Sequence, residues 1–432
     1  MPKINIYESD LTTAGGLNAS SNVVYVPGFA KFIKTKYAAG GENEIKFPYQ
    51  FNSVAEFKNV FSKDDGTFEY IGFYNDTDKD KKIISVERTM VYALSILQAG
   101  LPIMFDMISQ SGDAPKSFES EFEKSLISNL MGSKLDKITD RNNYDIKFIT
   151  SGGYANYSDS DESKYGKSLG AKMLEIAATR ADCTALLDHD EKNDNYDTLK
   201  DMFNSKGKSA PANGKYGAMF TPWCTFELPS QQIGYKMPKM NMPGSLAYLL
   251  AFGTSVKGNN ANWLAAAGAS RGVIPYIDKP LEMLTEAQID NYALTTKNYI
   301  GVAINPIAQI NPYGVIVWGN RTLHQGTNGL IASNFLNIRQ LCNDIKKTIY
   351  VACKSITFEQ NSDILWVKFK SLITPLLDQM LTGNGISGYN LKKKKSTKKA
   401  TLTATIRVFP IEAVEDFEMT VELADEATNV IE

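Results

Sequence analysis

The chain has 432 residues, enough for two or three domains that each bury a hydrophobic core. Hydrophobic residues make up 43% of it and charged residues 22%, which excludes wholesale disorder and a fibrous repeat. The formal net charge of -2 argues against a polyanionic partner such as duplex DNA. We therefore expect a globular, multidomain protein.

The N-terminus, MPKINIYESD, lacks the apolar core of a secretory signal, and no run approaches the roughly 18 apolar residues of a membrane span. We therefore expect a protein that is made and kept in the cytoplasm. The four cysteines lack a CxxC motif, which favours buried, reduced thiols over a disulfide or a metal site. Because the chain has only two histidines, we expect no histidine-rich metal site.

The chain begins with an alternation in which Ile4 and Ile6 share one face, which predicts a short strand before a flexible joint, LTTAGGLNASSN. The body begins at VVYVPGFA, and a second strand is predicted near EIKF. Two helices are predicted next: NSVAEFKNVF, capped by Asn52 or Ser53, and SVERTMVYALSILQAG, ended by Gly100. LPIMFDMI is then typical of a buried strand.

Residues 111 to 145 are polar and charged, which we interpret as an insertion or long connection. From Asp145 onward, strand and helix patterns alternate through IKFITSGG, SLGAKMLEIAATR, CTALLDHD and YGAMFTPWCTFEL. Such alternation predicts an α/β layer with a mostly parallel or mixed sheet that is flanked by helices.

The final third begins with a strand, GVIVWGNRTL, and continues with a long helix from about Asn334. One face of this helix is apolar, and the opposite face carries Arg339, Lys346 and Lys347. A second helix starts near Ser362, and Pro375 should kink or break it. After LKKKKSTKK, two amphipathic strands, TLTATIRVF and FEMTVEL, are predicted to end the chain.

Enzyme motifs in the chain are incomplete. Gly166-Lys167-Ser168 resembles the end of a P-loop, but Asp161 stands where the first glycine is needed. Residues 383 to 388 match GxGxxG in a reversed context, because a helix precedes them and a strand follows. Asp188-His189-Asp190, at the end of a predicted strand, is the best remaining catalytic candidate, although we favour a role in turns and helix caps.

Two features leave alternatives open. The six lysines between Lys392 and Lys399 suit a solvated linker, an anionic partner, or charge pairing with the acidic tail of a neighbouring copy. The amphipathic strands at both chain ends must pair with some sheet, because their backbone donors and acceptors are otherwise unsatisfied. That sheet could belong to the same chain or to a neighbour.

Read in order, the segments resemble the contractile tail sheath protein family. The resemblance rests on VYVPGFA, FNSVAEFKNVF, AATRADCTALLDHD and GAMFTPWCTF, and most specifically on INPI followed by GVIVWGNRTL, FLNIRQLCNDIKKTIYVACKSITFEQNSDILWVKF and ATIRVFPIEAVEDF. It implies an N-terminal arm at 1–20, an α/β body at 21–310, an α+β sheath domain at 311–391, and a basic hinge with C-terminal arm strands at 392–432.

The resemblance implies a structural subunit, not an enzyme, that acts without a cofactor. Such subunits form stacked six-fold rings around a tail tube, contact baseplate and terminator proteins, and bind neither nucleic acid nor membrane directly. They are assembled in the host cytoplasm into the virion tail. Their contraction drives the tube through the target cell envelope.

The terminal arms of such subunits complete the sheets of adjacent copies. This implies that the arm strands are anchored by Ile4, Ile6, Leu402, Ile406, Val408, Phe417 and Val421. The basic helix face formed by Arg339, Lys346 and Lys347 is a hypothetical contact with an acidic tube. The rival readings are an α/β hydrolase-like enzyme that uses Asp188 and His189, and a monomeric binding module whose terminal strands pair at home.

Overall fold

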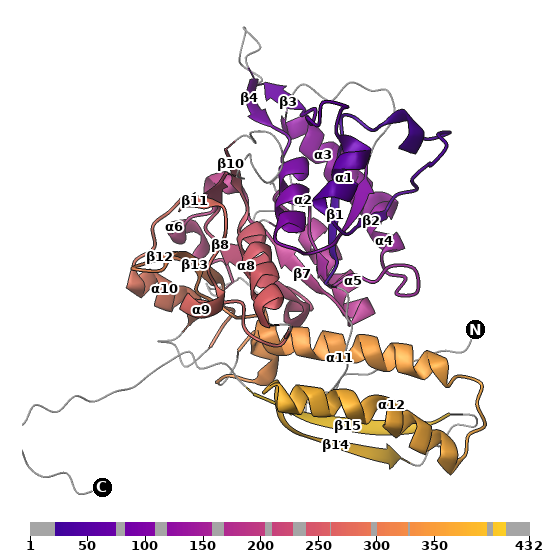
Figure 1. Ribbon diagram of the computed structural model, residues 1–432. Coiled ribbons are helices and arrows are strands. Elements are labelled where there is room, and N and C mark those ends of the chain that lie inside the picture. Colours follow the sequence, from indigo (N-terminus) through magenta and orange to yellow (C-terminus); the bar gives the residue numbers. More distant parts are fainter. Residues whose placement is uncertain are drawn as a thin grey trace, which may run out of the picture.

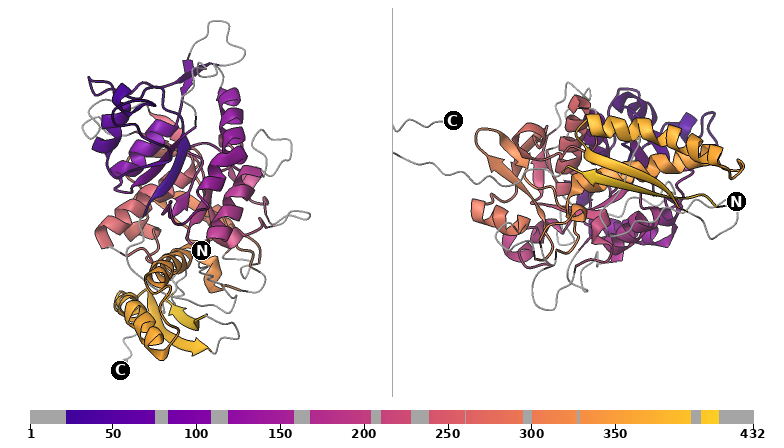
Figure 2. Two further views of the ribbon diagram at one scale, coloured as in Figure 1. Left: turned by 90° about the vertical axis from the view of Figure 1, so that its right-hand side faces the viewer. Right: turned by 90° about the horizontal axis from the view of Figure 1, so that it is seen from below.

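The computed structural model describes residues 22–74, 83–108, 119–157, 168–203, 210–227, 239–259, 261–294, 300–326, 329–394 and 401–411. It has two parts, which Figure 1 shows one above the other. The upper part is a large α/β body, and the lower part is a domain of two long helices and a hairpin at the C-terminal end of the described chain. Figure 2 shows the same division from two further sides.

An eight-stranded sheet forms the centre of the body, in the order β13-β12-β8-β7-β6-β1-β5-β2. The six central strands run parallel, whereas β13 and β2 pair antiparallel at the two edges. This confirms the predicted sheet. In chain order its strands are β1 (Val24–Gly28), β2 (Tyr49–Phe51), β5 (Ile103–Met107), β6 (Phe148–Ile149), β7 (Thr184–Leu187), β8 (Gly217–Thr221), β12 (Asn305–Ile310) and β13 (Gly314–Val317).

The sheet is covered on both faces, which is why its strands are near-continuous apolar runs. In β1, Val24 and Val26 face one core cluster and Tyr25 faces the other. The first cluster is covered by α1 (Val54–Phe61), α2 (Thr89–Gln98) and α8 (Gly244–Asn259). The second is covered by α3 (Glu119–Asn129), η2 (Leu130–Lys134), α4 (Leu135–Lys137) and α5 (Ser168–Arg180).

Smaller elements complete the body. The strands are β3 (Gly72–Tyr74) with β4 (Ile83–Val86), and a three-stranded sheet of β9 (Cys224–Phe226), β10 (Met240–Met242) and β11 (Ile277–Pro280). The helices are α6 (Tyr196–Leu199), α9 (Gly268–Arg271) and α10 (Glu286–Ala293). The single turns are η1 (Thr35–Tyr37), η3 (Glu191–Asn193), η4 (Gly214–Tyr216) and η6 (Ala332–Asn334).

Several local predictions are confirmed and others are wrong. Ser53 caps α1, because its side chain accepts a hydrogen bond from the Glu56 backbone N–H. The strand predicted near EIKF is the edge strand β2, which begins just beyond that segment, after Pro48, which has no N–H to donate. Within the predicted insertion, residues 119–137 are helical, and Phe122 and Leu126 of α3 are buried against the sheet.

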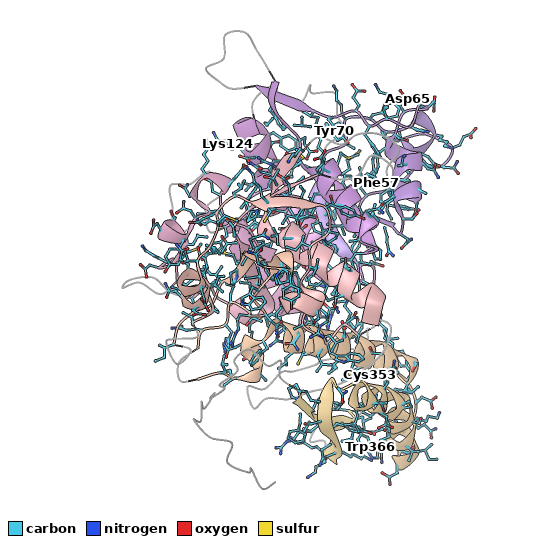
Figure 3. The ribbon with its side chains drawn as sticks, turned by 60° about the vertical axis from the view of Figure 1, so that its left-hand side comes forward. Phe57, Asp65, Tyr70, Lys124, Cys353 and Trp366 are labelled. Carbon is cyan, nitrogen blue, oxygen red and sulfur yellow. The ribbon has the colours of Figure 1, made fainter. Side chains whose placement is uncertain are left out.

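The C-terminal domain contains α11 (Leu336–Ser355), α12 (Asp363–Thr382), β14 (Ile386–Lys394) and β15 (Thr403–Pro410). It has its own apolar cluster, which includes Leu341, Ile345, Phe369, Ile373, Leu377 and Val408. Figure 3 shows Cys353 and Trp366 in this domain, well apart from Phe57 in the body. Pro375 lies inside α12, which the structure describes as a single helix, so the predicted break is absent.

The division between these parts differs from the expected one. The strand β13 pairs with β12, so the body's sheet extends past the predicted boundary at residue 311. The other predicted boundary, at residue 392, falls inside β14, which pairs with β15 over Ile386–Lys394 and Thr403–Pro410. Residues 392–394 and 403–410 therefore form part of the C-terminal domain itself.

Candidate assembly surface

The hairpin of β14 and β15 is a two-stranded antiparallel sheet at the periphery of the molecule (Figures 1 and 2). Its register runs from Ile386 opposite Pro410 to Lys394 opposite Thr403, with an irregularity between Ile386 and Gly388. Within the described residues no third strand joins it, so each strand has one edge without a ladder partner. Such edges present backbone N–H and C=O groups that another strand can pair with.

The inner face of the hairpin is apolar and packs against α11 and α12. Tyr389 and Leu391 of β14 join the cluster beside Ala404, Ile406 and Val408 of β15. The Tyr389 hydroxyl donates a 2.6 Å hydrogen bond to Asp378 of α12. This bond, with a smaller contribution from burial, raises the pKa of Tyr389 to about 12. The hairpin is thus fixed to the helices, and among the described residues nothing pairs with the outer edge of either strand.

The structure corrects the interpretation of three predicted arm residues. Ile406 and Val408 lie in β15, Leu402 directly precedes it, and all three pack in the cluster of their own chain, where Val408 is only 2% exposed. They pack within their own chain because β14 supplies a partner strand for β15. The lysine run in β14 had hidden the strand pattern of that segment in the sequence. The other predicted arm residues, Ile4, Ile6, Phe417 and Val421, lie outside the described residues.

The helix α11 joins the hairpin domain to the body. It crosses the amino ends of the parallel strands, where Lys147 precedes β6 and Thr184 opens β7. The side chains of Gln340 and Asn343 each donate a 3.0 Å hydrogen bond to the Thr184 hydroxyl. This contact is therefore polar, in contrast to the apolar contact between α11 and α12.

The predicted tube-facing residues lie in this contact. Arg339 is 2% exposed, and Lys346 and Lys347 are each 7% exposed. Arg339 and Lys346 lie over the ring of Tyr216, and Lys347 pairs with Asp145 at 2.5 Å. Their burial contradicts the tube-facing hypothesis, because the basic face of α11 meets acidic and aromatic groups of the same chain.

A buried ion pair lies at the centre of this contact. Lys147 Nζ is 2.5 Å from Asp344 Oδ1, and the two side chains are 0% and 6% exposed. Burial lowers the pKa of Lys147, and the charge and hydrogen bond of Asp344 oppose that effect. Asn262 donates a 3.0 Å hydrogen bond to the other oxygen of Asp344. Both oxygens of the carboxylate are thereby satisfied.

The catalytic candidate lies at the opposite, carboxyl end of the sheet. Asp188 accepts hydrogen bonds from the Ser245 backbone N–H at 3.0 Å and the Ser245 hydroxyl at 2.6 Å, where α8 begins. Asp190 caps η3, and the His189 carbonyl accepts a hydrogen bond from Trp223 Nε1. The predicted capping role is confirmed, and Asp188 and His189 are each at most 3% exposed.

Asp188 gives a pH prediction. Burial raises its pKa from an ordinary 3.8 to about 7. The neutral carboxyl is therefore favoured in the folded state, and the stability that it contributes is lost as the pH rises toward 7. We expect the parent protein to lose stability relative to Asp188→Asn between about pH 4 and about pH 7, with little further change above that. Urea unfolding of both proteins at each pH measures this difference, and a constant difference would contradict the assignment.

Other site types have little support in the described part of the chain. No group of three or more His, Cys, Asp or Glu side chains there is arranged to hold a metal ion. Among the same residues, no helix is both long and apolar enough to cross a membrane. All four cysteines are free thiols, of which Cys183 and Cys224 are buried.

Comparisons with known proteins identify the fold. No known family profile matches the chain. A tail sheath protein of Vibrio phage KVP40 is 28% identical over 150 residues, which are 35% of this chain and 20% of that protein. The chain thus spans about a fifth of the length of this curated relative.

Solved structures resemble nearly the whole chain. The sheath complex of an extracellular contractile injection system, PVC, in its contracted state has a TM-score of 0.60 at 15% identity, over 99% of this chain and 98% of that one. The contracted helical sheath of the anti-feeding prophage has a TM-score of 0.58 at 15% identity, over 98% of this chain and 99% of that one. A chain of the anti-feeding prophage baseplate in its contracted state has a TM-score of 0.66 at 16% sequence identity, over 98% of this chain and 98% of that one. The sequence-based resemblance and the predicted fold class are thereby confirmed.

Proposed function

We propose that this chain, which has the fold of contractile sheath proteins, is the sheath subunit of a phage tail or a phage-like injection particle. The observation that carries the proposal is the likeness to a contracted sheath complex over 99% of this chain, because it includes both the body and the hairpin domain. The sequence match to a phage tail sheath protein supports the same conclusion independently of the fold.

The open hairpin supports a mechanism of assembly. Terminal segments of neighbouring copies add as strands to the free edges of β14 and β15. Each added backbone hydrogen bond stabilises the contact by about 0.5 to 1.5 kcal/mol, and several form along one strand. The same joint repeats at every subunit. Copies are thereby linked into a continuous helical mesh of stacked six-fold rings.

The same arrangement accounts for contraction without a cofactor or a nucleotide. The bodies move as rigid units, and the strand joints hold neighbours together while the packing changes. Energy stored at assembly, as the difference between two packings, drives the inner tube through the target envelope. The partners are other copies, the tail tube, and the baseplate and terminator proteins. The subunit acts in the tail of the assembled particle, after assembly in the host cytoplasm, and catalyses no reaction.

The experiment is negative-stain microscopy of the purified full-length protein over a range of concentrations. We expect hollow tubes of uniform width above a critical concentration, because sheath subunits carry all the strands that join them. Sedimentation velocity on the same samples measures the monomer that remains. A protein that stays monomeric at every concentration, with or without added tube protein, would favour the monomeric binding module instead.

A further inference from the structure

The body and the C-terminal domain are held together by separate apolar cores. Among the described residues, the two large body clusters contain one residue of α11, Leu336, which is fully buried where that helix begins. Conversely, Trp263 is the one body residue in the described chain that packs against the C-terminal cluster. The two cores therefore share very little apolar contact.

Both of these residues belong to a joint at the amino end of α11. Asn337, the second residue of α11, donates a 3.0 Å hydrogen bond to the Trp263 carbonyl. Asn337 also exchanges two hydrogen bonds, of 2.8 and 3.1 Å, with Asn320, which follows β13. The Trp263 indole N–H donates a 2.9 Å hydrogen bond to the carbonyl of Gly383, where α12 ends. This end of the contact thus combines packing with hydrogen bonds.

Along the rest of α11, polar and charged side chains meet the body. The contacts include the hydrogen bonds of Gln340 and Asn343 to Thr184, and the ion pairs of Lys147 with Asp344 and of Lys347 with Asp145. At the outer end, Tyr350 donates a 2.9 Å hydrogen bond to Asn142, and Arg141 lies over the Tyr350 ring. The contact thus changes in character along the helix.

A polar contact separates at lower cost than an apolar one. Hydrogen-bonding and charged groups exchange their protein partners for water when they separate, so they keep most of their interactions. Apolar groups find no such replacement and lose the benefit of burial. Two domains of one chain are therefore expected to move relative to each other unless the contact between them is large and apolar.

We infer that the C-terminal domain swings on the body about the amino end of α11, where Leu336, Asn337 and Trp263 form the hinge. In the closed arrangement of Figure 1, α11 lies between the body and the rest of the C-terminal domain. In the open arrangement, the polar side chains from Gln340 to Tyr350 leave the body and are hydrated. The inference goes beyond the proposed function, because it concerns a motion within one copy.

The swing changes the direction of the hairpin relative to the body. The helices α11 and α12 and the hairpin of β14 and β15 share one apolar cluster, so they move together as a unit. The sheet of the body and its covering helices have clusters of their own and move as the other unit. A hinge at one end of α11 therefore redirects the hairpin without disturbing either core.

Chemical modification of Lys147 tests the inference. Its side chain is fully buried in the closed arrangement, where it pairs with Asp344 of α11 and its Nζ lies 5.7 Å from the centre of the Phe252 ring. The thiol of Cys224 is the reference, because it is 0% exposed in a body cluster that the swing leaves intact. Samples of the full-length protein are treated with an acetylating reagent or a maleimide, and peptide mass spectrometry gives the two rates. Each rate is divided into that of the urea-unfolded chain to give a protection factor.

We expect the protection factor of Lys147 to be at least about tenfold smaller than that of Cys224, because the swing exposes the lysine and only unfolding of the body exposes the thiol. Hydrogen exchange on the same protein measures the backbone of α11. Its amides should be better protected than the Lys147 side chain, because the helix stays folded while it leaves the body.

A charge reversal in the polar part of the contact should favour the open arrangement. Lys347→Glu places a carboxylate against Asp145 in place of their ion pair. We expect the acetylation rate of Lys147 to rise about threefold or more, and the rate of Cys224 to stay unchanged. Lys200→Glu is the control, because it reverses one partner of the exposed pair with Asp197 and should change neither rate.

Three results would overturn the inference. Equal protection of Lys147 and Cys224 in the parent protein would show that the lysine is reached only when the body unfolds. Exchange of the α11 amides as fast as the lysine reacts would indicate local unfolding of the helix instead of a swing. A Lys347→Glu variant that reacts at the parent rate would show that the polar contact does not control the opening. None of these measurements needs tubes, so the proposed function is tested separately.

Discussion

Replacing Asp344 by alanine is expected to lower the free energy of unfolding by about 3 to 5 kcal/mol, because it leaves the buried Lys147 ammonium without its partner. Lys147 is fully buried, and Asp344 provides its 2.5 Å ion pair. The same change also removes the acceptor of the Asn262 side chain. Urea unfolding of the full chain, followed by circular dichroism, measures the loss.

An exposed ion pair serves as the control, because it contains the same two residue types without their burial. Asp197 pairs with Lys200 at 2.8 Å, but these side chains are 87% and 36% exposed. Asp197→Ala should therefore cost less than about 1 kcal/mol. The double change Lys147→Met with Asp344→Leu should recover part of the loss, because it removes both charges from the contact. Equal losses for Asp344→Ala and Asp197→Ala would show that the buried pair has no special role.

The same contact explains why the basic face of α11 was misread. Its helical periodicity correctly places Arg339, Lys346 and Lys347 on one face. A helix with one charged face is usually solvated on that side. Here the compensating groups are remote in sequence: Asp145 lies 202 positions from Lys347. No single-helix pattern encodes a partner at that separation, so only the tertiary structure reveals the burial.

The body was more predictable because its strands are buried on both faces. Apolar runs such as those of β1 and β5 have few alternatives to a central strand, and the helices between them carry clear caps and stops. The sequence analysis does not predict the helix α3, although the buried residues Phe122, Leu126 and Leu130 recur every four positions, as on one face of a helix. Charged neighbours obscured that spacing, which was the signal available.

The hairpin shows how composition can conceal a strand. In β14, Tyr389 and Leu391 alternate with Gly388 and Asn390, which is a strand pattern. The lysines that follow suggested a solvated linker. They are compatible with a strand because the side chains of Lys392, Lys393 and Lys394 are all exposed. The predicted tail strand TLTATIRVF was correct as a strand, but its partner is β14 of the same chain.

Removing residues 412–432 is expected to abolish tube formation and leave the fold intact. In the described part of the chain, the three large core clusters are built from residues up to Val408, and the truncation removes none of these residues. It removes instead the whole acidic segment that a neighbouring hairpin would bind. We expect an unchanged thermal midpoint by circular dichroism, a monomer in sedimentation velocity, and no tubes by microscopy.

A shorter truncation tests whether the loss belongs to the acidic strand. Removing only residues 428–432 keeps seven of the eight carboxylates and the alternation around Phe417 and Val421. Tubes should persist in this control, because most of the segment that would add to a neighbouring hairpin remains. Tubes formed by the longer truncation would contradict the role of the tail. A large drop in its thermal midpoint would mean that the tail stabilises its own subunit, since a strand shared only between copies contributes nothing to an isolated monomer.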